Sequence, residues 1–340
     1  MSSFQQPVEL RVRDIGEQGL LERLQRFCPA DIVGDDAAVM PFPGSGRSLV
    51  VTTDVLVDGV HFSDRTTSPE DAGWRATAAN LSDLAAMGAA PIGITVGLSV
   101  TGDVAVSWVE RLYQGITQCL QQYNTVIVGG DVVRSPVISL SITAFGQALP
   151  NRILRRSTAV VGNAIVITGV HGASRAGLEL LLNPELGKHL SEAERTYLIQ
   201  AHQRPKPRLD VLPLLWNSLD SYSAVQVAGM DSSDGLADAI LQLCRASGVG
   251  ARLERTSIPL SSAMSKLISV APILDWALYG GEDFELLLCL PPEPAEALVA
   301  QLGGAAIIGN ITTGTEVWLT DSTGTCADEL LALSRGFQHF

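Results

Sequence analysis

The sequence predicts an α/β (α+β) protein of two domains. Its 340 residues exceed the roughly 250 residues beyond which a single hydrophobic core stops growing. Segments with helical spacing alternate with strand-like segments in both halves. Apolar residues make up 46% of the chain and charged residues 17%, which is ample material for a packed core. We therefore expect an N-terminal domain of residues 1–150 and a C-terminal domain of residues 151–340.

In the first half, apolar spacing and turn residues define the elements. Residues 69–87 have the pattern of a helix that begins at a proline and ends before a glycine. The predicted helices are 14–27, 69–87 and 104–123, and the predicted strands are 48–53, 92–100, 125–128 and 137–146. The basic cluster of Arg152, Arg155 and Arg156 follows them and marks the expected crossing between the domains.

The second half begins again in the same style. A strand at 164–168 leads through a glycine-rich turn into a helix from about residue 174. That turn is as consistent with an ordinary helix entry as with an anion site. Two helices are expected on either side of the basic segment 204–208. The other predicted elements are strands at 224–230 and 284–290 and a helix that ends near residue 247.

The charge balance is acidic, with 23 basic and 36 acidic residues and a net charge of −13. Such a surface repels nucleic acid and anionic lipid, so neither is expected as a partner. Two long uncharged stretches, 84–102 and 157–174, are interrupted by turn residues and are predicted to be strands and turns, not membrane spans. The five cysteines are dispersed and the first residues lack a signal-peptide pattern, so we expect a reducing, cytoplasmic location.

Carboxylates recur at the predicted ends of strands, each beside glycine or a small hydroxyl residue. Asp83 differs, because it lies in the predicted helix 69–87, on the same face as Asn80. Magnesium prefers oxygen ligands of this kind, and a neighbouring glycine lets a phosphate approach the backbone. The carboxylates at predicted strand ends are Asp35, Asp36, Asp54, Asp131, Asp231, Asp234, Glu282 and Asp283.

One glycine–aspartate pair is ordinary turn chemistry, but five such clusters in a single chain favour a shared metal site. Divalent ions in an acidic cleft can bind an anionic nucleotide, which reconciles the net negative charge with a nucleotide ligand. No phosphate-binding motif competes, because the sequence has neither GxxxxGKS/T nor GxGxxG in a dinucleotide-binding context. The residues therefore predict metal-assisted ATP chemistry.

Short motifs run along nearly the whole chain. They are Gly-Asp-Asp-Ala at 34–37, Thr-Asp at 53–54 with Gly-Val-His-Phe at 59–62, Asn-Leu-Ser-Asp-Leu-Ala-Ala-Met-Gly at 80–88, Gly-Gly-Asp at 129–131, Arg-Pro-Lys-Pro-Arg at 204–208, Asp-Ser-Ser-Asp-Gly-Leu at 231–236, Gly-Gly-Glu-Asp-Phe-Glu-Leu at 280–286 and Gly-Phe-Gln-His-Phe at 336–340. With them the sequence resembles the thiamine monophosphate kinase family, of the superfamily that includes aminoimidazole ribonucleotide synthetase and selenophosphate synthetase. Val60 stands where the family commonly has asparagine.

The resemblance implies ATP-dependent, magnesium-dependent phosphorylation of thiamine monophosphate to thiamine diphosphate by in-line transfer, in thiamine diphosphate biosynthesis. Several Mg²⁺ ions would be held by Asp36, Thr52, Thr53, Asp54, Asp83, Asp131, Asp231 and Asp234. ATP would be contacted by Tyr113, Gly130, Asp131, Arg156 and Ser233. The thiamine portion would be contacted by His61, Glu282 and Phe337.

The resemblance also implies a two-domain architecture like that of aminoimidazole ribonucleotide synthetase. The N-terminal domain would bind ATP and magnesium and form a barrel across a homodimer, and the C-terminal α/β domain would complete the active site. The acceptor is already an ionised phosphate oxygen, so no general base is assigned. The carboxylates expected to act in catalysis through metal ions are Asp36, Asp54, Asp83, Asp131 and Asp231.

Two rival functions stay open at this stage. One is another ATP enzyme of the superfamily, although a selenophosphate synthetase would carry a reactive cysteine near a lysine, and Cys28 has no such neighbour. The other is a non-catalytic nucleotide- or metal-binding module. Among single residues, an aromatic face and a carboxylate both suit the thiazolium cation, yet Phe337 could simply pack on the core and His61 could be structural.

Overall fold

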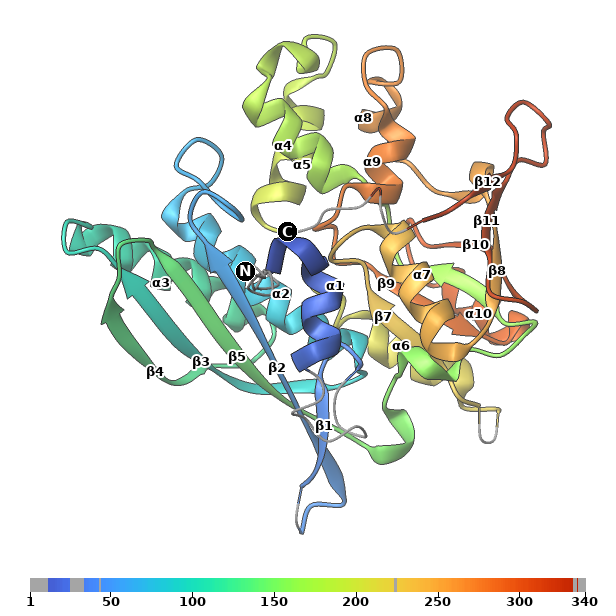
Figure 1. Ribbon diagram of the computed structural model, residues 1–340, viewed down its shortest axis with the longest axis horizontal. Coiled ribbons are helices and arrows are strands. Elements are labelled where there is room, and N and C mark those ends of the chain that lie inside the picture. Colours follow the sequence, from blue (N-terminus) through green and yellow to red (C-terminus); the bar gives the residue numbers. More distant parts are fainter. Residues whose placement is uncertain (1–11, 25–33, 43, 223–224, 333–334, 336–340) are drawn as a thin grey trace, which may run out of the picture.

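The computed structural model describes residues 12–24, 34–42, 44–222, 225–332 and 335. The chain forms two β-sheets, one in each half, and helix α2 (Pro69–Ala86) lies between them (Figure 1). This mixed arrangement confirms the predicted fold class. The boundary at residue 150 stays a prediction; the first sheet ends at Ala148 and the second begins at Ala164.

The N-terminal sheet has five strands in the order β1-β2-β5-β3-β4, and only the pair β3–β4 is parallel. Its strands are β1 (Ala38–Phe42), β2 (Arg47–Val57), β3 (Ala90–Val100), β4 (Ile127–Arg134) and β5 (Ser139–Ala148). Helices α2 and α3 (Val106–Gln122) lie along one face (Figure 1). Alternate side chains point to that face, so Val50, Val96 and Ile142 are fully buried beneath the helices.

Helix α2 is buried on nearly every side, because it packs on the first sheet, on α3 and on the second domain. Its N-cap is Ser68, whose hydroxyl accepts a hydrogen bond from the Asp71 amide at 3.2 Å. Glycines let it approach α3 closely: a Cβ on Gly73 would lie 2.1 Å from the Leu112 carbonyl oxygen, and one on Gly115 would lie 1.8 Å from that of Glu70. Neither position can therefore accept a side chain.

The C-terminal sheet has seven strands in the order β12-β11-β8-β10-β6-β9-β7. Its strands are β6 (Ala164–Ile167), β7 (Ala228–Asp231), β8 (Gly250–Glu254), β9 (Leu286–Leu290), β10 (Ala306–Thr312), β11 (Val317–Thr320) and β12 (Glu329–Leu330). The helices around it are α4 (Ala173–Leu182), α5 (Glu192–Gln203), α6 (Val211–Leu219), α7 (Leu236–Ser247), α8 (Ser262–Ser265), α9 (Ile273–Tyr279) and α10 (Pro292–Val299). Among the described residues, none of the helices combines the length and apolar character needed to span a bilayer.

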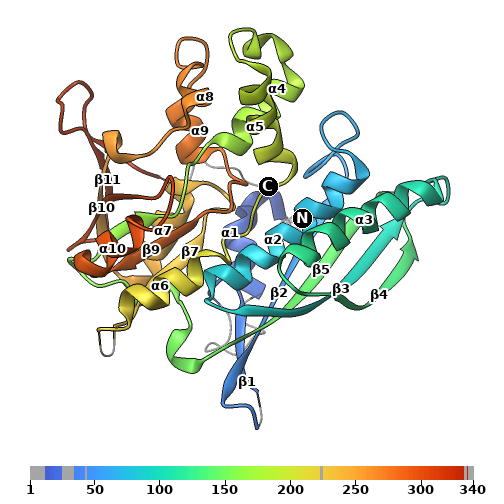
Figure 2. The ribbon, with the colours of Figure 1, turned by 180° about the vertical axis from the view of Figure 1, so that it is seen from behind.

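Strand β9 shows how this core is divided. All five of its residues are buried and apolar. Leu287 and Cys289 pack with α7, whereas Leu286 and Leu288 pack with α6 and α10, which Figure 2 shows on the face seen from behind. A strand covered on both faces reads as a continuous apolar run. The strand β7 at the edge of this sheet ends at Asp231, next to α2.

The structure corrects the expected placement of two carboxylates. Asp54 and Asp131 were predicted to follow strand ends, but β2 continues to Val57 and β4 continues to Arg134. The glycines before Asp131 belong to the strand, since a Cβ on Gly130 would lie 2.2 Å from the Val96 carbonyl oxygen. The helix expected at 14–27 is described as α1 (Val12–Leu24), and β1, β8 and the strands β10 to β12 were not predicted.

Candidate active site

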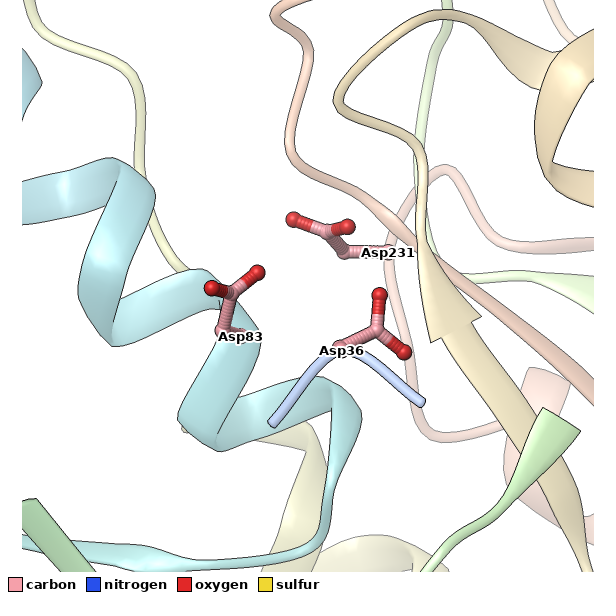
Figure 3. A group of neighbouring side chains, drawn as sticks. All are labelled: Asp36, Asp83 and Asp231. Atoms are coloured by element: carbon pink, nitrogen blue, oxygen red, sulfur yellow. The ribbon is translucent and has the colours of Figure 1, made fainter. Parts of the chain in front are cut away.

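Three aspartates from distant parts of the chain meet between the two domains (Figure 3). Asp36 lies in the loop before β1, Asp83 lies near the end of α2, and Asp231 is the last residue of β7. One carboxylate oxygen of each lies within 4.8 Å of the others. Carboxylate oxygens brought this close are a suitable ligand set for a divalent cation.

Hydroxyl groups hold these carboxylates in place. The Thr52 hydroxyl, in β2, lies within hydrogen-bonding distance of the Asp83 carboxylate and, at 3.2 Å, of the Asp36 backbone oxygen. The Ser82 hydroxyl donates to the Asp231 carboxylate at 2.5 Å. Adjacent residues of α2 therefore contact both domains, since Asp83 is bound to Thr52 of β2 and Ser82 is bound to Asp231 of β7.

Asp54 interacts electrostatically with the three clustered aspartates. Its backbone amide donates to the Asn80 side-chain oxygen at 3.2 Å, so β2 is tied to α2 at the same level as Asp83. Burial, and then repulsion from Asp36, raises the pKa of the Asp54 carboxyl to about 6. The sequence placed Asn80 and Asp83 on one helix face, and both contribute to this cluster.

Burial also raises the pKa values of the other carboxyls. The pKa of Asp231 rises to about 8, first through burial and then through repulsion from Asp36. The pKa of Asp83 lies well above its usual range, because burial adds to repulsion from Asp54 and Asp231. The pKa of Asp36 is raised by burial, although Arg156 partly offsets this. Without a cation the cluster therefore retains protons near neutral pH, and a bound cation would favour full ionisation.

Two arginines from the interdomain segment approach the cluster. Arg156 donates to the Asp36 carboxylate from Nη2 at 2.8 Å and from Nε at 3.3 Å. Its Nη1 donates to Gln242 at 2.7 Å. Arg155 pairs with Asp35 at 2.7 Å. The basic segment predicted from the sequence therefore touches the acidic motif at 34–37 directly.

Asp131 does not belong to this cluster within the chain. Where β4 pairs with β3, Gly130 lies beside Val96 and Asp131 lies beside Gly97. Asp131 therefore points to the face of the sheet opposite the one that carries Asp54. It is exposed and accepts a hydrogen bond from the Val132 amide at 2.9 Å. It therefore lies apart from the cluster of Asp36, Asp83 and Asp231.

Thr53 shares that open face. Its hydroxyl lies 2.9 Å from the Thr143 hydroxyl of the neighbouring strand, and the side chain is exposed. Thr52 and Thr53, both predicted as metal ligands, therefore point to opposite sides of the sheet. The two cannot serve the same buried position.

Two of the predicted substrate residues meet at an arginine that sequence reasoning missed. Arg75 donates from Nη2 to the His61 backbone oxygen at 3.3 Å and also to the Glu282 carboxylate. The only sequence signal was a charged residue inside an apolar stretch of the predicted helix 69–87. Phe337 lies outside the described residues.

The remaining predicted contacts lie in separate places. Tyr113, in α3, packs against the N-terminal core, and burial raises its pKa. Ser233 is half-buried and Asp234 is exposed in the loop after β7. The Ser233 backbone oxygen accepts a hydrogen bond from the Glu282 amide at 2.6 Å. This bond joins the loop that follows Asp231 to the loop that carries Glu282.

Family models and known proteins match most of the chain. Residues 34–148 match the family "AIR synthase related protein, N-terminal domain" and residues 160–321 match the corresponding C-terminal domain. A thiamine-monophosphate kinase of Synechococcus elongatus is 53% identical over 96% of this chain and 97% of its own length. The Escherichia coli thiamine-monophosphate kinase is 34% identical over 91% of each chain.

Solved structures share the fold. One described as AaThiL complexed with AMPPCP and TMP has a TM-score of 0.82 and 31% identity, and the match covers 98% of this chain and all of that one. The thiamine monophosphate kinase of Aquifex aeolicus has a TM-score of 0.77 at 32% identity, with 94% of this chain covered and 100% of that chain. The hydrogenase maturation protein HypE in complex with ATP, at 20% identity and a TM-score of 0.65, shares the fold alone.

Proposed function

Because this chain belongs to the AIR synthase related family and, within it, to the thiamine-monophosphate kinases, we propose that it transfers the γ-phosphoryl group of ATP to thiamine monophosphate. The product is thiamine diphosphate. The observation that carries this function is the 53% identity to a thiamine-monophosphate kinase over nearly the whole chain. The meeting of Asp36, Asp83 and Asp231 supplies a site with the chemistry that such a reaction requires.

Magnesium ions belong at this acidic cluster in our proposal. The fit rests on carboxylates within 4.8 Å of one another, with Asp231 buried and Asp36 and Asp83 half-buried. It rests also on their raised pKa values, because a cation stabilises such a cluster. Asp36, Asp83 and Asp231 would hold an ion, with Thr52 and Asp54 beside them. Thr53, Asp131 and Asp234 lie elsewhere, which fits several ions. When bound, Mg²⁺ neutralises phosphate charge and polarises the phosphoryl oxygens.

The protein's own residues bind, orient and balance charge. The acceptor phosphate is already ionised, so no side chain has to remove a proton from it. Arg156 would offset triphosphate charge with a guanidinium that now neutralises Asp36. The other proposed ATP contacts are Tyr113, Gly130, Asp131 and Ser233.

The substrate side has the charge that a thiazolium requires. Burial raises the pKa of the Glu282 carboxyl, but the charge and hydrogen bond of Arg75, together with the nearby His202 and His61, outweigh it, and the net pKa is lowered. An ionised carboxylate at this position can face the thiazolium cation. His61 contributes the backbone oxygen that Arg75 binds. Phe337 remains a proposed aromatic contact.

A coupled assay of ADP release tests the function. With ATP and Mg²⁺, adding thiamine monophosphate should stimulate ADP release strongly, and removing divalent ions with EDTA should abolish it. The physical reason is that ATP and thiamine monophosphate are both anions. Without divalent ions, the carboxylates of the acidic cluster would repel them and oppose their approach. ATP binding without turnover on any acceptor would instead support a non-catalytic binding module. Stimulation by a different acceptor alone would support another enzyme of the superfamily.

A homodimer through the N-terminal sheet is part of the proposal, and the edge strand β4 supports it. Val128 and Val132 are 59% and 61% exposed, and Val126 and Val133 are also exposed. An exposed apolar edge strand is a ready template for pairing with another chain.

Val132→Asp should therefore shift the mass measured by light scattering from dimer to monomer. Ile268→Asp, at an exposed position of the second domain, is the control and should leave the mass unchanged. A monomeric wild-type protein would contradict the proposal.

We propose a cytoplasmic location for the enzyme. Of the described cysteines, Cys119, Cys244 and Cys289 are buried and Cys326 is exposed, and all four are free thiols. Free thiols are typical of proteins kept in a reducing compartment.

A further inference from the structure

We propose that Arg75 is a positioning residue for thiamine monophosphate, which holds the Glu282 carboxylate against the His61 backbone across the domain interface. The inference rests on the proposed function and names a residue that sets the geometry of the substrate site. Arg75 belongs to α2, whereas Glu282 precedes β9 in the other domain. One guanidinium therefore connects both halves of the site.

The contacts of Arg75 are those of a fixed, buried charge. The residue is 2% exposed. Its Nη2 donates to the Glu282 carboxylate and, at 3.3 Å, to the His61 backbone oxygen. Its Nη1 donates to the His202 backbone oxygen and lies 3.2 Å from His202 Nδ1. A planar guanidinium with partners at both terminal nitrogens has little freedom to turn.

The conformation of Glu282 is maintained by contacts with other parts of the protein. Its φ of 60° lies in the left-handed region, which non-glycine residues adopt only where the surroundings impose it. Its amide donates to the Ser233 backbone oxygen at 2.6 Å, and Arg75 binds carboxylate oxygen Oε1. The side chain is still 34% exposed. A ligand can therefore reach a carboxylate whose direction is already set.

His202 contacts Arg75 but carries no charge. Burial first, and then the Arg75 charge, lowers its pKa to about 3, so the imidazole is neutral at physiological pH. The neutral Nδ1 can accept from Arg75 at 3.2 Å or from the Ser174 hydroxyl at 3.3 Å. The positive charge that keeps Glu282 ionised therefore comes mainly from Arg75.

The buried arginine is not explained by stability. Its neighbours in α2, Trp74 and Ala76, are core residues, and a buried ion pair is often no more stabilising than apolar side chains of similar volume. The Arg75 Nε is buried without a hydrogen-bond partner among the described residues. An orphaned buried donor is tolerated where the group serves another purpose. Orientation of the Glu282 carboxylate toward the substrate is the purpose that the geometry indicates.

The test compares substrate constants in four variants. Arg75→Gln and Glu282→Gln should each raise the KM for thiamine monophosphate by about tenfold or more, the size expected when a charge-assisted hydrogen bond is lost. The KM for ATP should change little. Arg75→Lys should recover part of the effect. The double variant Arg75→Gln/Glu282→Gln should be no worse than Glu282→Gln alone, because Arg75 acts through Glu282.

Arg204→Gln is the matched control. Arg204 also crosses the domain interface, where it pairs with Asp71 at 2.6 Å and stacks on Trp74, but it does not contact His61 or Glu282 in any described interaction. It should leave the KM for thiamine monophosphate unchanged, and thermal melting should confirm that every variant is folded. The double variant, which leaves neither charge unpaired, keeps the test usable if Arg75→Gln unfolds.

Three results would overturn the inference. These are an equal rise in both KM values, additive effects in the double variant, or the same effect from Arg204→Gln. Failure of the proposed function looks different, because the wild-type protein would then show no stimulation by thiamine monophosphate. The wild-type assay therefore comes first and separates the two outcomes.

Discussion

Asp83→Asn should lower turnover by about a hundred- to a thousandfold, since the loss of a metal ligand removes several kcal/mol of charge stabilisation in the transition state. The asparagine keeps the volume of the side chain, and its amide oxygen can still accept from Thr52. The fold should therefore survive, and removing one of several mutually repelling carboxylates should leave the metal-free protein at least as stable. Steady-state kinetics with saturating ATP and Mg²⁺ measure the effect.

Asp71→Asn is the control on the same helix. Asp71 binds Arg204 and Ser68 near the start of α2, away from the acidic cluster. It should cost a little stability and leave turnover close to that of the wild type. If Asp83→Asn kept near-wild-type turnover with saturating ATP and Mg²⁺, the shared metal site would have to be abandoned.

The metal-free protein should lose stability as the pH rises, because the carboxyls of the acidic cluster, Asp231 among them, have raised pKa values. The pKa of the Asp231 carboxyl rises from an ordinary value of 3.8 to about 8 in the folded protein. A raised folded pKa favours the protonated folded state, so its contribution is fully present below the unfolded pKa and is lost as the pH rises through the folded pKa. Between about pH 5 and about pH 8 the loss from this carboxyl should be on the order of 4 kcal/mol, at about 1.4 kcal/mol for each pH unit. Asp54, with a folded pKa of about 6, adds to the lower part of that range.

Thermal unfolding with EDTA and with Mg²⁺ measures this dependence. Mg²⁺ should restore stability more at pH 8 than at pH 5, because its ligands must be deprotonated. Asp231→Asn should flatten the profile of the metal-free protein and remove most of the Mg²⁺ effect. A wild-type profile that rises with pH in EDTA would contradict the account of the cluster.

The sequence predicted the central feature of the site because local chemistry marked it. Asp36 stands in a loop that contains Gly34, Asp231 ends a strand before two serines, and Asp83 stands in a helix whose apolar spacing was clear. Such positions identify themselves by type and neighbours. The motifs only imply that these aspartates come together in the tertiary structure. The structure shows that they meet between the domains.

Other features depended on long-range packing that short motifs do not reveal. A glycine pair before Asp131 reads as a turn, but in β4 it accommodates the neighbouring strand, and the resulting register turns Asp131 away from Asp54. Arg75 looked like any charged residue of a helix, and its partners His202 and Glu282 lie 127 and 207 positions away in the sequence. Sequence patterns report local periods, not contacts at such separations.

The same packing explains why one helix matters so much. The C-terminal part of α2 carries Ser82 and Asp83 to the metal cluster, and its middle carries Arg75 to the substrate residues. A rigid helix with tight glycine contacts to α3 therefore sets the distance between the two sites. Substrates held on such an element need little further ordering before they react.

Calorimetric titration with a non-hydrolysable ATP analogue tests the central claim most directly. If ions at Asp36, Asp83 and Asp231 connect the protein to the triphosphate, the wild type should bind the analogue in Mg²⁺, bind it far more weakly in EDTA, and lose the difference in Asp231→Asn. Equally tight binding with and without Mg²⁺, or an unchanged Mg²⁺ effect in Asp231→Asn, would contradict it.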